Sequence, residues 1–304
     1  METITVFKVY FKPKRDIVVP PFTSKLSRTI IIKALEKQGF NEVVSEIKAP
    51  WKTKPYVFTV VFQNNKPLFK TAKSPPKPLV LKANEEYFFK VTTIGSQRSL
   101  RIVQAISNTP EVSVYNSEVL LVGVEARTVD FGSLKVKPNY DYVKLEFITP
   151  TLLQLPKPKK IKEKIKLRHI LFPLPMLITY SLAKHWNLHA PDQEKISNVE
   201  KLAIISNYIL QEVNYKLKPV TAIYDEKRRP RGIVGWTIYK INNINKKHTE
   251  TILKLLNYAN YIGIGRSRTI GFGTTKTTHI QPSANPILAD DSRGEVLYTL
   301  RFIP

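Results

Sequence analysis

The sequence contains no cysteine among its 304 residues, and this absence excludes several kinds of chemistry at once. Disulfide frameworks, zinc sites with thiolate ligands and cysteine nucleophiles all require that residue. Histidine is scarce as well, because there are only five and the first of them is His169. This scarcity argues against a histidine-rich metal site, and we expect neither a metal ion nor another cofactor.

Acidic residues are half as numerous as basic ones. The chain has 24 Asp and Glu against 48 Lys and Arg, which gives a formal net charge of +24 at pH 7. A compact chain with this excess repels itself, so a polyanionic partner such as a nucleic acid is the usual explanation. Hydrophobic residues still make up 42% of the sequence. The length fits two folded domains of about 150 residues each.

The sequence also lacks a long apolar run. Its most apolar window covers residues 170–183 and is interrupted by Pro173 and Pro175. Because a helix needs about 20 apolar residues to cross a bilayer, this window is too short and too broken. The N-terminus shows no basic stretch followed by an apolar one, so no secretory signal is indicated. We expect a cytoplasmic protein with no membrane partner.

The first half of the chain alternates between strand-like and helix-like segments. Runs of β-branched and aromatic residues predict strands. Leu26, Ile30 and Ala34 recur every four residues and predict a helix with one buried face. In chain order, we expect a strand at 3–11, a helix at 24–38, strands at 56–62 and 86–94, a helix at 97–106 and a strand at 119–124.

The same order then starts again, after a boundary at residues 131–141. We expect a strand at 143–147, helices at 174–186 and 197–212, paired strands at 220–224 and 233–239, a helix at 249–259 and a final strand at 296–302. Strand, helix, two strands, helix and strand, occurring twice, predicts an α+β protein with two tandem ferredoxin-like (RRM-like) domains. We place these domains at residues 1–135 and 136–304.

The sharpest local feature is the segment 263–273, which holds four of the 11 glycines: Gly263, Gly265, Gly271 and Gly273. Glycine lets a backbone adopt positive φ or approach another backbone closely, and successive N–H groups there can hold phosphate oxygens. Arg266 and Arg268 add fork-shaped donors. The segment is neither a Walker loop, which ends in Gly-Lys-Ser/Thr, nor a dinucleotide fingerprint, whose third glycine is replaced by Arg268. We expect these six residues to contact a nucleic acid, and the segment itself to pack the two domains together.

Three further basic sites are less specific. Arg228 and Arg229 lie in the loop between two expected strands. They form either a solvated hairpin tip or a site that binds phosphate. Arg231 adjoins Gly232 at the start of the second strand, where a functional role is favoured. Residues 157–168, which end at Arg168, hold seven cations and one acid and resemble a mobile arm with non-specific attraction for phosphate.

These features together resemble a known family. The segment 263–273 is similar to the glycine-rich signature of the RAMP superfamily of CRISPR-associated RNA-binding proteins. Residues 146–153, 218–222 and 231–236 precede it in the order found in the archaeal repeat-RNA-processing endoribonucleases of that superfamily. The resemblance implies tandem ferredoxin-like domains, a CRISPR precursor RNA as substrate, and metal-independent cleavage within each repeat.

One departure from the family concerns the mechanism. Many members use a histidine around the first helix, whereas this chain has no histidine before His169; some archaeal members also lack it and depend on Lys and Arg. RNA supplies its own nucleophile, the 2′-hydroxyl, so alignment and fixed cations suffice to assist cleavage to a 2′,3′-cyclic phosphate and a 5′-OH. By the motif match and this chemistry, we expect the catalytic residues to be Lys25, Arg28, Lys54 and Arg231.

Two other functions stay open at this level. The missing histidine favours a non-catalytic RAMP-type subunit that binds CRISPR RNA inside an effector complex. A generic RNA-binding protein on a two-domain fold is the other alternative. The sequence also leaves open a homodimer and association with effector-complex subunits.

Overall fold

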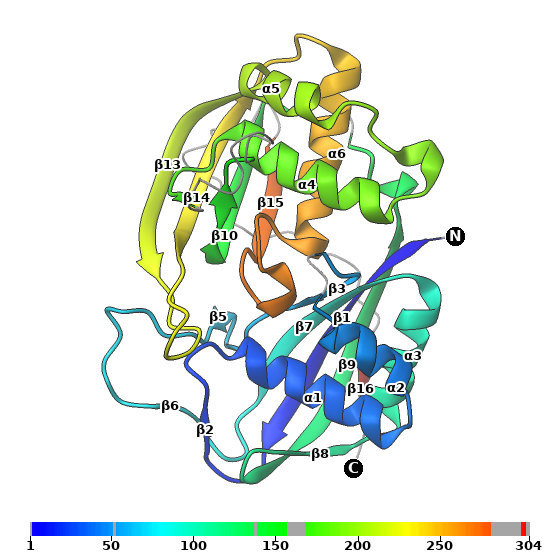
Figure 1. Ribbon diagram of the computed structural model, residues 1–304, viewed down its shortest axis with the longest axis vertical. Helices are drawn as coiled ribbons and strands as arrows, with labels where there is room; N and C mark the ends of the chain where they lie inside the picture. The colour runs from blue at the N-terminus through cyan, green and yellow to red at the C-terminus, as the bar shows by residue number, and fades with distance from the viewer. Residues whose placement is uncertain (1, 51–52, 137–138, 157–167, 281–298, 302–304) are drawn as a thin grey trace.

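The computed structural model describes residues 2–50, 53–136, 139–156, 168–280 and 299–301 (Figure 1). They form two α/β lobes that follow one another along the long axis of the molecule, and in each lobe the helices cover one face of an antiparallel sheet. The expected α+β architecture is thereby confirmed.

The first lobe is built around the strands β1 (Thr3–Pro13), β3 (Tyr56–Phe58), β7 (Tyr87–Ile94) and β9 (Ser117–Asp130). β1 pairs with β9 on one side and with β7 on the other, and β3 pairs with β7. This order, with the first strand between the last and the third, is that of a ferredoxin-like fold. The helices α1 (Ser24–Lys37) and α3 (Ser96–Ser107) are the two crossover helices.

The helix α1 follows the expected spacing closely. Leu26, Ile30 and Ala34 have no exposed surface and join the core beneath the sheet. Thr23 precedes the helix, and its hydroxyl donates to the carbonyl of Leu68 and accepts from the N–H of Val61 instead of capping the helix. The start of α1 is therefore fixed to neighbouring chain segments.

Shorter elements complete the first lobe: β2 (Ile17–Val19), α2 (Asn41–Lys48), β4 (Phe62–Gln63), β5 (Lys66–Pro67), β6 (Leu79–Leu81) and β8 (Glu111–Val114). The helix α2 was not predicted, because its eight residues give only two turns of periodic pattern. β8 and β9 form a hairpin in which Val114 pairs with Ser117.

The second lobe repeats the arrangement. Its sheet has the order β13 (Leu210–Thr221), β14 (Arg231–Ile241), β10 (Tyr142–Thr151) and β15 (Thr275–Ile280). The helices are α4 (Pro175–His189), α5 (Val199–Ile209) and α6 (Lys246–Ile262), and β11 (Leu153–Gln154) pairs with β12 (His169–Ile170). The first strand again lies between the fourth and the third, so both lobes are ferredoxin-like.

Two segments of the second half differ from expectation. The helix expected at 197–212 ends at Ile209, and β13 starts at Leu210 rather than at Val220. β13 is an edge strand whose residues are mostly exposed on both faces, so it lacks the alternation that marks a half-buried strand. The closing strand of this lobe is β15, whereas β16 (Thr299–Arg301), within the expected final strand, pairs with β9 of the first lobe. The predicted domain boundary at residue 135 assigns residues 299–301 to the C-terminal domain, whereas this pairing adds them to the N-terminal sheet.

An aromatic cluster joins the two lobes. Phe22, just before α1, stacks on Phe272 of the glycine-rich segment at a centroid distance of 4.3 Å, and both are almost fully buried. The hydroxyl of Ser24 donates to the carbonyl of Ile270 at 2.6 Å. A side chain on Gly271 would lie 2.6 Å from Cβ of Ser24. The glycine-rich segment therefore packs the domains together, as the sequence led us to expect.

Glycine is required within this segment because the backbone approaches itself. Gly273 has φ +72°, and a Cβ there would fall on the carbonyl oxygen of Ile264. Gly39, after α1, has a similar φ of +74°, but nothing lies within 4 Å of the position of its missing Cβ. The two glycines therefore share a backbone conformation and differ in their surroundings.

We expect Gly39→Ala to cost about 1–2 kcal/mol, because any residue with a Cβ is strained at positive φ. Gly273→Ala should lower the free energy of unfolding by about 2 kcal/mol more than Gly39→Ala, since its methyl group also meets backbone. Chemical denaturation of both variants measures the difference. Equal losses in the free energy of unfolding would show that the close backbone approach at Gly273 does not add to the destabilisation.

Candidate active site

Lys25 lies where the two lobes meet. Its Nζ is 4.6 Å from the ring centroid of Tyr224, which follows β13 in the second lobe. The guanidinium of Arg228 lies 4.6 Å from the centroid of the same ring. Asp225 connects these cations, with Oδ2 at 3.8 Å from Lys25 Nζ and at 2.6 Å from Arg228 Nη2. The tip of the β13–β14 hairpin thus contacts α1, while the Arg228 side chain stays 64% exposed.

The cations next to Asp225 favour its charged form. Hydrogen bonding from Arg228 holds that pKa below its usual range, and the charge of Lys25 acts in the same direction. Asp225 was not among the expected site residues. It was missed because an acidic residue in a loop of mixed charge, next to Glu226 and Lys227, has no pattern that distinguishes it from a solvated turn.

Arg28 and Lys54 converge on a single atom. Arg28 Nη2 donates to the carbonyl oxygen of Ile47 at 2.8 Å, and Lys54 Nζ donates to the same oxygen at 2.6 Å. Ile47 lies in the last turn of α2, where carbonyls lack partners in the helix and carry the negative end of its dipole. Burial, together with the charge of Arg28, lowers the pKa of Lys54.

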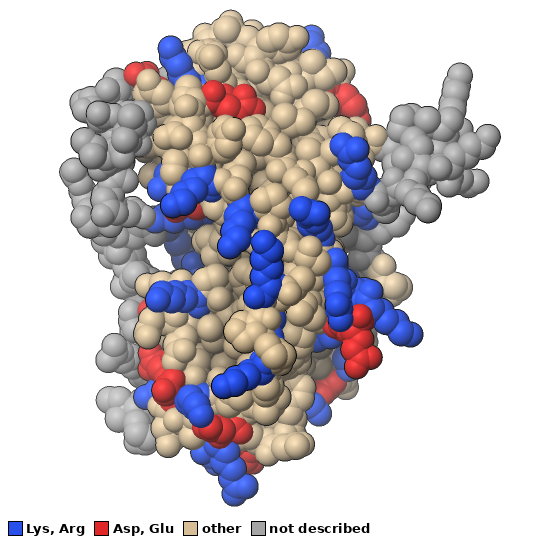
Figure 2. Space-filling model, turned by 90° about the vertical axis from the view of Figure 1, so that its left-hand side faces the viewer, with Lys and Arg blue, Asp and Glu red and all other residues tan. Residues whose placement is uncertain are grey.

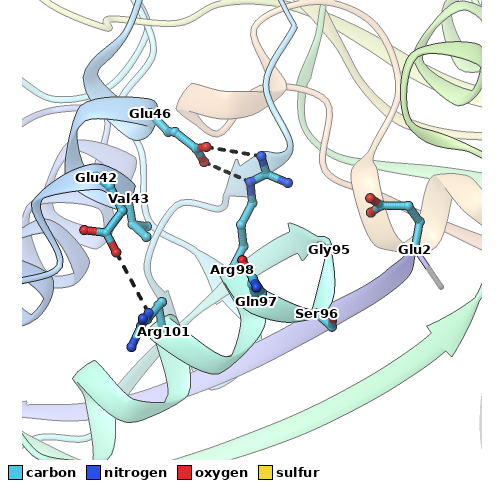
Figure 3. A pocket seen from close by; sticks show the side chains of 9 residues that line it. All are labelled: Glu2, Glu42, Val43, Glu46, Gly95, Ser96, Gln97, Arg98 and Arg101. Atoms are coloured by element: carbon cyan, nitrogen blue, oxygen red, sulfur yellow. Dashed lines mark hydrogen bonds and ion pairs between the residues drawn. The ribbon is translucent and has the colours of Figure 1, made fainter.

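An ion pair holds α2 in place (Figure 3). Arg98 of α3 donates to both carboxylate oxygens of Glu46, at 2.8 and 3.1 Å, and the buried Tyr56 donates to Glu46 at 2.7 Å. Glu46 precedes Ile47, so this network positions the carbonyl that Arg28 and Lys54 share. The buried His185 has a ring nitrogen 2.7 Å from the hydroxyl of Tyr258 and also hydrogen-bonds the backbone of Lys54.

Two cavities lie close to these residues. One of about 450 Å³ is lined by Lys25, Arg28 and Lys48 together with Tyr115 and Tyr224, and none of its described lining residues is acidic. The other, of about 310 Å³, is the one drawn in Figure 3 and contains the carboxylates Glu2, Glu42 and Glu46. Because carboxylates repel phosphate, the first cavity is the one suited to a nucleic acid.

The residues of the glycine-rich segment that we expected to contact a nucleic acid form hydrogen bonds within the protein. The N–H groups of the four glycines donate to neighbours: Gly263 to Ala259, Gly265 to Ser181, Gly271 to Arg268 and Gly273 to Pro150. Arg266 is exposed and bonds to the side chain of Gln154, whereas Arg268 is half-buried and donates to the carbonyl of Gly263. Burial lowers the pKa of Arg268 to about 10, which leaves it charged at neutral pH. Contact of these residues with RNA stays a prediction.

Arg231 lies in a different group from the other three expected catalytic residues. It starts β14, is exposed, and its backbone hydrogen-bonds His169. Burial lowers the pKa of His169 and the charge of Arg266 adds to this, whereas the hydrogen bond with Arg231 acts in the opposite direction. Arg168 is exposed next to His169, whereas the rest of the basic arm, residues 157–167, lies outside the described residues. The structure therefore brings together Lys25, Arg28 and Lys54, and places Arg231, Arg266 and Arg168 around His169.

Basic side chains continue over the adjoining surface. Figure 2 shows Lys and Arg running down the middle of the face that carries β13, with acidic side chains mainly towards its ends. Exposed residues of this side of the molecule are Lys66, Lys73, Lys77, Lys216, Lys218, Arg228 and Arg229. Such a surface attracts a phosphate backbone without reading its sequence. Among the described residues, no helix is long and apolar enough to cross a membrane.

The doubled ferredoxin-like fold, its glycine-rich junction and the basic cavity are the features expected of an RNA-binding protein of the class that the sequence resembles. Two family models give a narrower assignment. The model for the Cas6 N-terminal domain matches residues 5–129, and the model for the CRISPR-associated endoribonuclease Cas6 matches residues 145–275. The chain therefore belongs to the Cas6 family of CRISPR-associated endoribonucleases. The resemblance seen in the sequence and the expected enzyme class are confirmed.

Curated and solved relatives agree with this assignment. Two proteins of Saccharolobus solfataricus named CRISPR-associated endoribonuclease Cas6 1 and 2 are each 24% identical over 295 residues; the alignments cover 92% and 88% of this chain and 99% and 94% of theirs. Among solved structures, a Cas6 product complex has a TM-score of 0.67 and Thermus thermophilus Cas6 one of 0.64, at 17% and 16% identity. Both alignments cover 91% of this chain and 99% of the other, and they show the shared fold.

Proposed function

We propose that the protein cuts CRISPR repeat RNA in the cavity between α1 and the β13–β14 hairpin, by attack of a 2′-hydroxyl on the adjacent phosphorus. The bond from the 2′-oxygen to phosphorus forms as the bond to the 5′-oxygen breaks. The proton of the 2′-hydroxyl leaves, and another is delivered to the 5′-oxygen. The products are a 2′,3′-cyclic phosphate and a 5′-OH. Similarity to Cas6 structures named as product and substrate-mimic complexes supports an RNA substrate.

The observation that carries this proposal is the position of Arg28, which lines the cavity together with Lys25 and shares the carbonyl of Ile47 with Lys54. Charge develops on the phosphorane oxygens in the transition state, and a fixed donor there is worth about 3 kcal/mol. Arginine offers a planar set of charged donors that matches phosphate oxygens, so Arg28 serves as such a donor. Lys25 is held by Asp225 and Tyr224 at the edge of the same cavity and serves as a second one.

Lys54 is the group best suited to move a proton. An ordinary Lys, with a pKa of about 10.4, is almost fully protonated at neutral pH and is a poor base. Partial burial and the neighbouring charge of Arg28 lower the pKa of Lys54, and both causes favour the neutral amine. Lys54 therefore combines a position beside Arg28 with a shifted protonation equilibrium.

Further assignments follow from exposure and charge. Arg231, Arg266, Arg168 and the hairpin residues Arg228 and Arg229 would hold RNA on either side of the cut, as their exposure and charge allow. Association with a second copy or with effector subunits is supported by the exposed Val213 and Tyr215 on the edge strand β13. A cytoplasmic location is part of the same proposal, because the precursor transcript is present in the cytoplasm.

The reaction itself is tested with end-labelled repeat RNA in the presence of a chelator. We expect one discrete cut per repeat, and no cut at that position when its 2′-hydroxyl is replaced by hydrogen, because the nucleophile is then missing. Binding without cleavage would select a non-catalytic RNA-binding subunit. Cleavage of the deoxy-substituted repeat would rule out the 2′-hydroxyl as nucleophile.

Lys25→Ala should slow single-turnover cleavage by about tenfold or more, a barrier increase of at least about 1.4 kcal/mol. The matched control is Lys37→Ala, which removes an exposed Lys from the last turn of the same helix, about 18 Å further along it. The control should retain the full rate at saturating RNA. Equal rates for the two variants would remove Lys25 from the site.

The pH dependence of the rate tests Lys54. If the neutral amine accepts the proton, the single-turnover rate rises with pH and levels off above the pKa of Lys54, which burial and Arg28 place below the usual value for Lys. Lys54→Arg keeps the charge and the hydrogen-bonding reach but stays protonated, so it should be slow and nearly independent of pH between 6 and about 10. An unchanged profile in Lys54→Arg would exclude Lys54 as the base.

A further inference from the structure

Tyr115 has a backbone conformation that its side chain disfavours. It occupies the turn between β8 and β9, where Val114 pairs with Ser117, and its φ is +52°. Bulky residues rarely adopt positive φ, and two-residue hairpin turns normally place Gly, Asn or Asp there. Among the described residues, the other non-glycine positions with positive φ are Asn64, Asn65, Asn84 and Ser267. Strain of this kind collects at functional sites.

The ring of Tyr115 is directed to the proposed active site. It lines the cavity of about 450 Å³ with Lys25, Arg28 and Lys48, and its hydroxyl hydrogen-bonds Thr29 of α1. Its side chain nevertheless remains exposed, with 49% of its surface accessible. The ring is thus anchored at its hydroxyl end and open beside three cations.

Tyr224, the other tyrosine of the cavity, does not offer a comparable surface. It is only 6% exposed, and its ring is in contact with Lys25, Arg228, Phe22 and Phe272. Among the described lining residues, a flat ligand therefore finds one accessible aromatic ring in this cavity, that of Tyr115. The cavity is also within the range of about 300–1,000 Å³ found for small-ligand sites.

We propose that Tyr115 is a stacking platform for one nucleobase of the bound RNA, next to the phosphate held by Lys25 and Arg28. Single-stranded RNA is recognised by splaying bases onto aromatic side chains, and a phosphate on cations with an adjacent base on a ring is the chemistry of one nucleotide. Tyr115 is a binding residue in this scheme and takes no part in proton transfer. The inference rests on the proposed function, because it assigns a role within the same site.

The first experiment compares three substitutions at this position. Tyr115→Gly and Tyr115→Asn remove the ring and suit a positive φ, so both variants should fold with a melting temperature equal to or above that of the wild type. Their affinity for uncut repeat RNA should fall by about 5- to 150-fold, the equivalent of about 1–3 kcal/mol per stacked base. Tyr115→Phe should bind nearly as the wild type does. Unchanged affinity in both ring-less variants would overturn the proposal.

The second experiment identifies the base. Affinities of the wild type and of Tyr115→Gly are measured for a series of repeats, each with one abasic nucleotide near the cut. At the stacked position, the abasic substitution should weaken the wild type but leave Tyr115→Gly unaffected, since the contact is already lost. Additive losses at every position would show that the ring supports the fold of the turn and contacts no base.

The proposed function and the proposed role of Tyr115 can be contradicted independently of each other. Affinity is measured with a repeat whose 2′-hydroxyl at the cut is replaced by hydrogen, or with unmodified repeat if the wild type does not cut it. A protein that binds RNA through Tyr115 without cutting contradicts the proposed function alone. A protein that cuts equally well and binds equally tightly without the Tyr115 ring contradicts this inference alone.

Discussion

The docking of the glycine-rich segment on the first turn of α1 is the contact on which the geometry of the site depends. Gly271 approaches Ser24 so closely that no side chain fits between them, and Phe272 stacks on Phe22. Both contacts lie at the start of the helix that carries Lys25 and Arg28. The second domain thereby sets the direction of that helix, and its hairpin supplies Tyr224 and Asp225 on the other side of Lys25.

The electrostatic design follows from this placement. Lys25, Arg28 and Lys48 surround a cavity whose described lining residues include no carboxylate. Of the acids nearby, Glu46 pairs with Arg98, and Asp225 is shared between Lys25 and Arg228. A surplus of positive charge in a partly desolvated place stabilises an incoming phosphate and at the same time lowers the proton affinity of Lys54. In the proposed mechanism, RNA binding and proton transfer therefore depend on the same high local density of positive charge.

Much of the fold could be predicted from residue patterns, because both sheets and most helices bury one face. The spacing of Leu26, Ile30 and Ala34 predicted α1, and the glycines of segment 263–273 predicted a close junction between domains, which the structure confirms. β13 escaped prediction because an edge strand exposed on both faces has no alternating pattern. The short α2 escaped because two turns carry too little periodicity.

The candidate site was predictable only in part, for a related reason. Charge and motif indicated Lys25 and Arg28, but the acceptor that gathers Arg28 and Lys54 is a backbone carbonyl of Ile47, which no side-chain pattern reveals. Asp225 and Tyr115 act through tertiary proximity and backbone conformation. Arg231 was expected with the other three cations and lies instead against His169.

The return of β16 to the first sheet has a consequence for how the chain is assembled. Thr299–Arg301 forms backbone pairs with residues 123–125 of β9, after the second domain has been completed by β15. The N-terminal sheet is thus finished only after the polypeptide that forms the second domain has been made. Until then, its β9 border offers unpaired amides and carbonyls to any passing strand, so nascent or C-terminally clipped molecules would be the aggregation-prone forms of this protein.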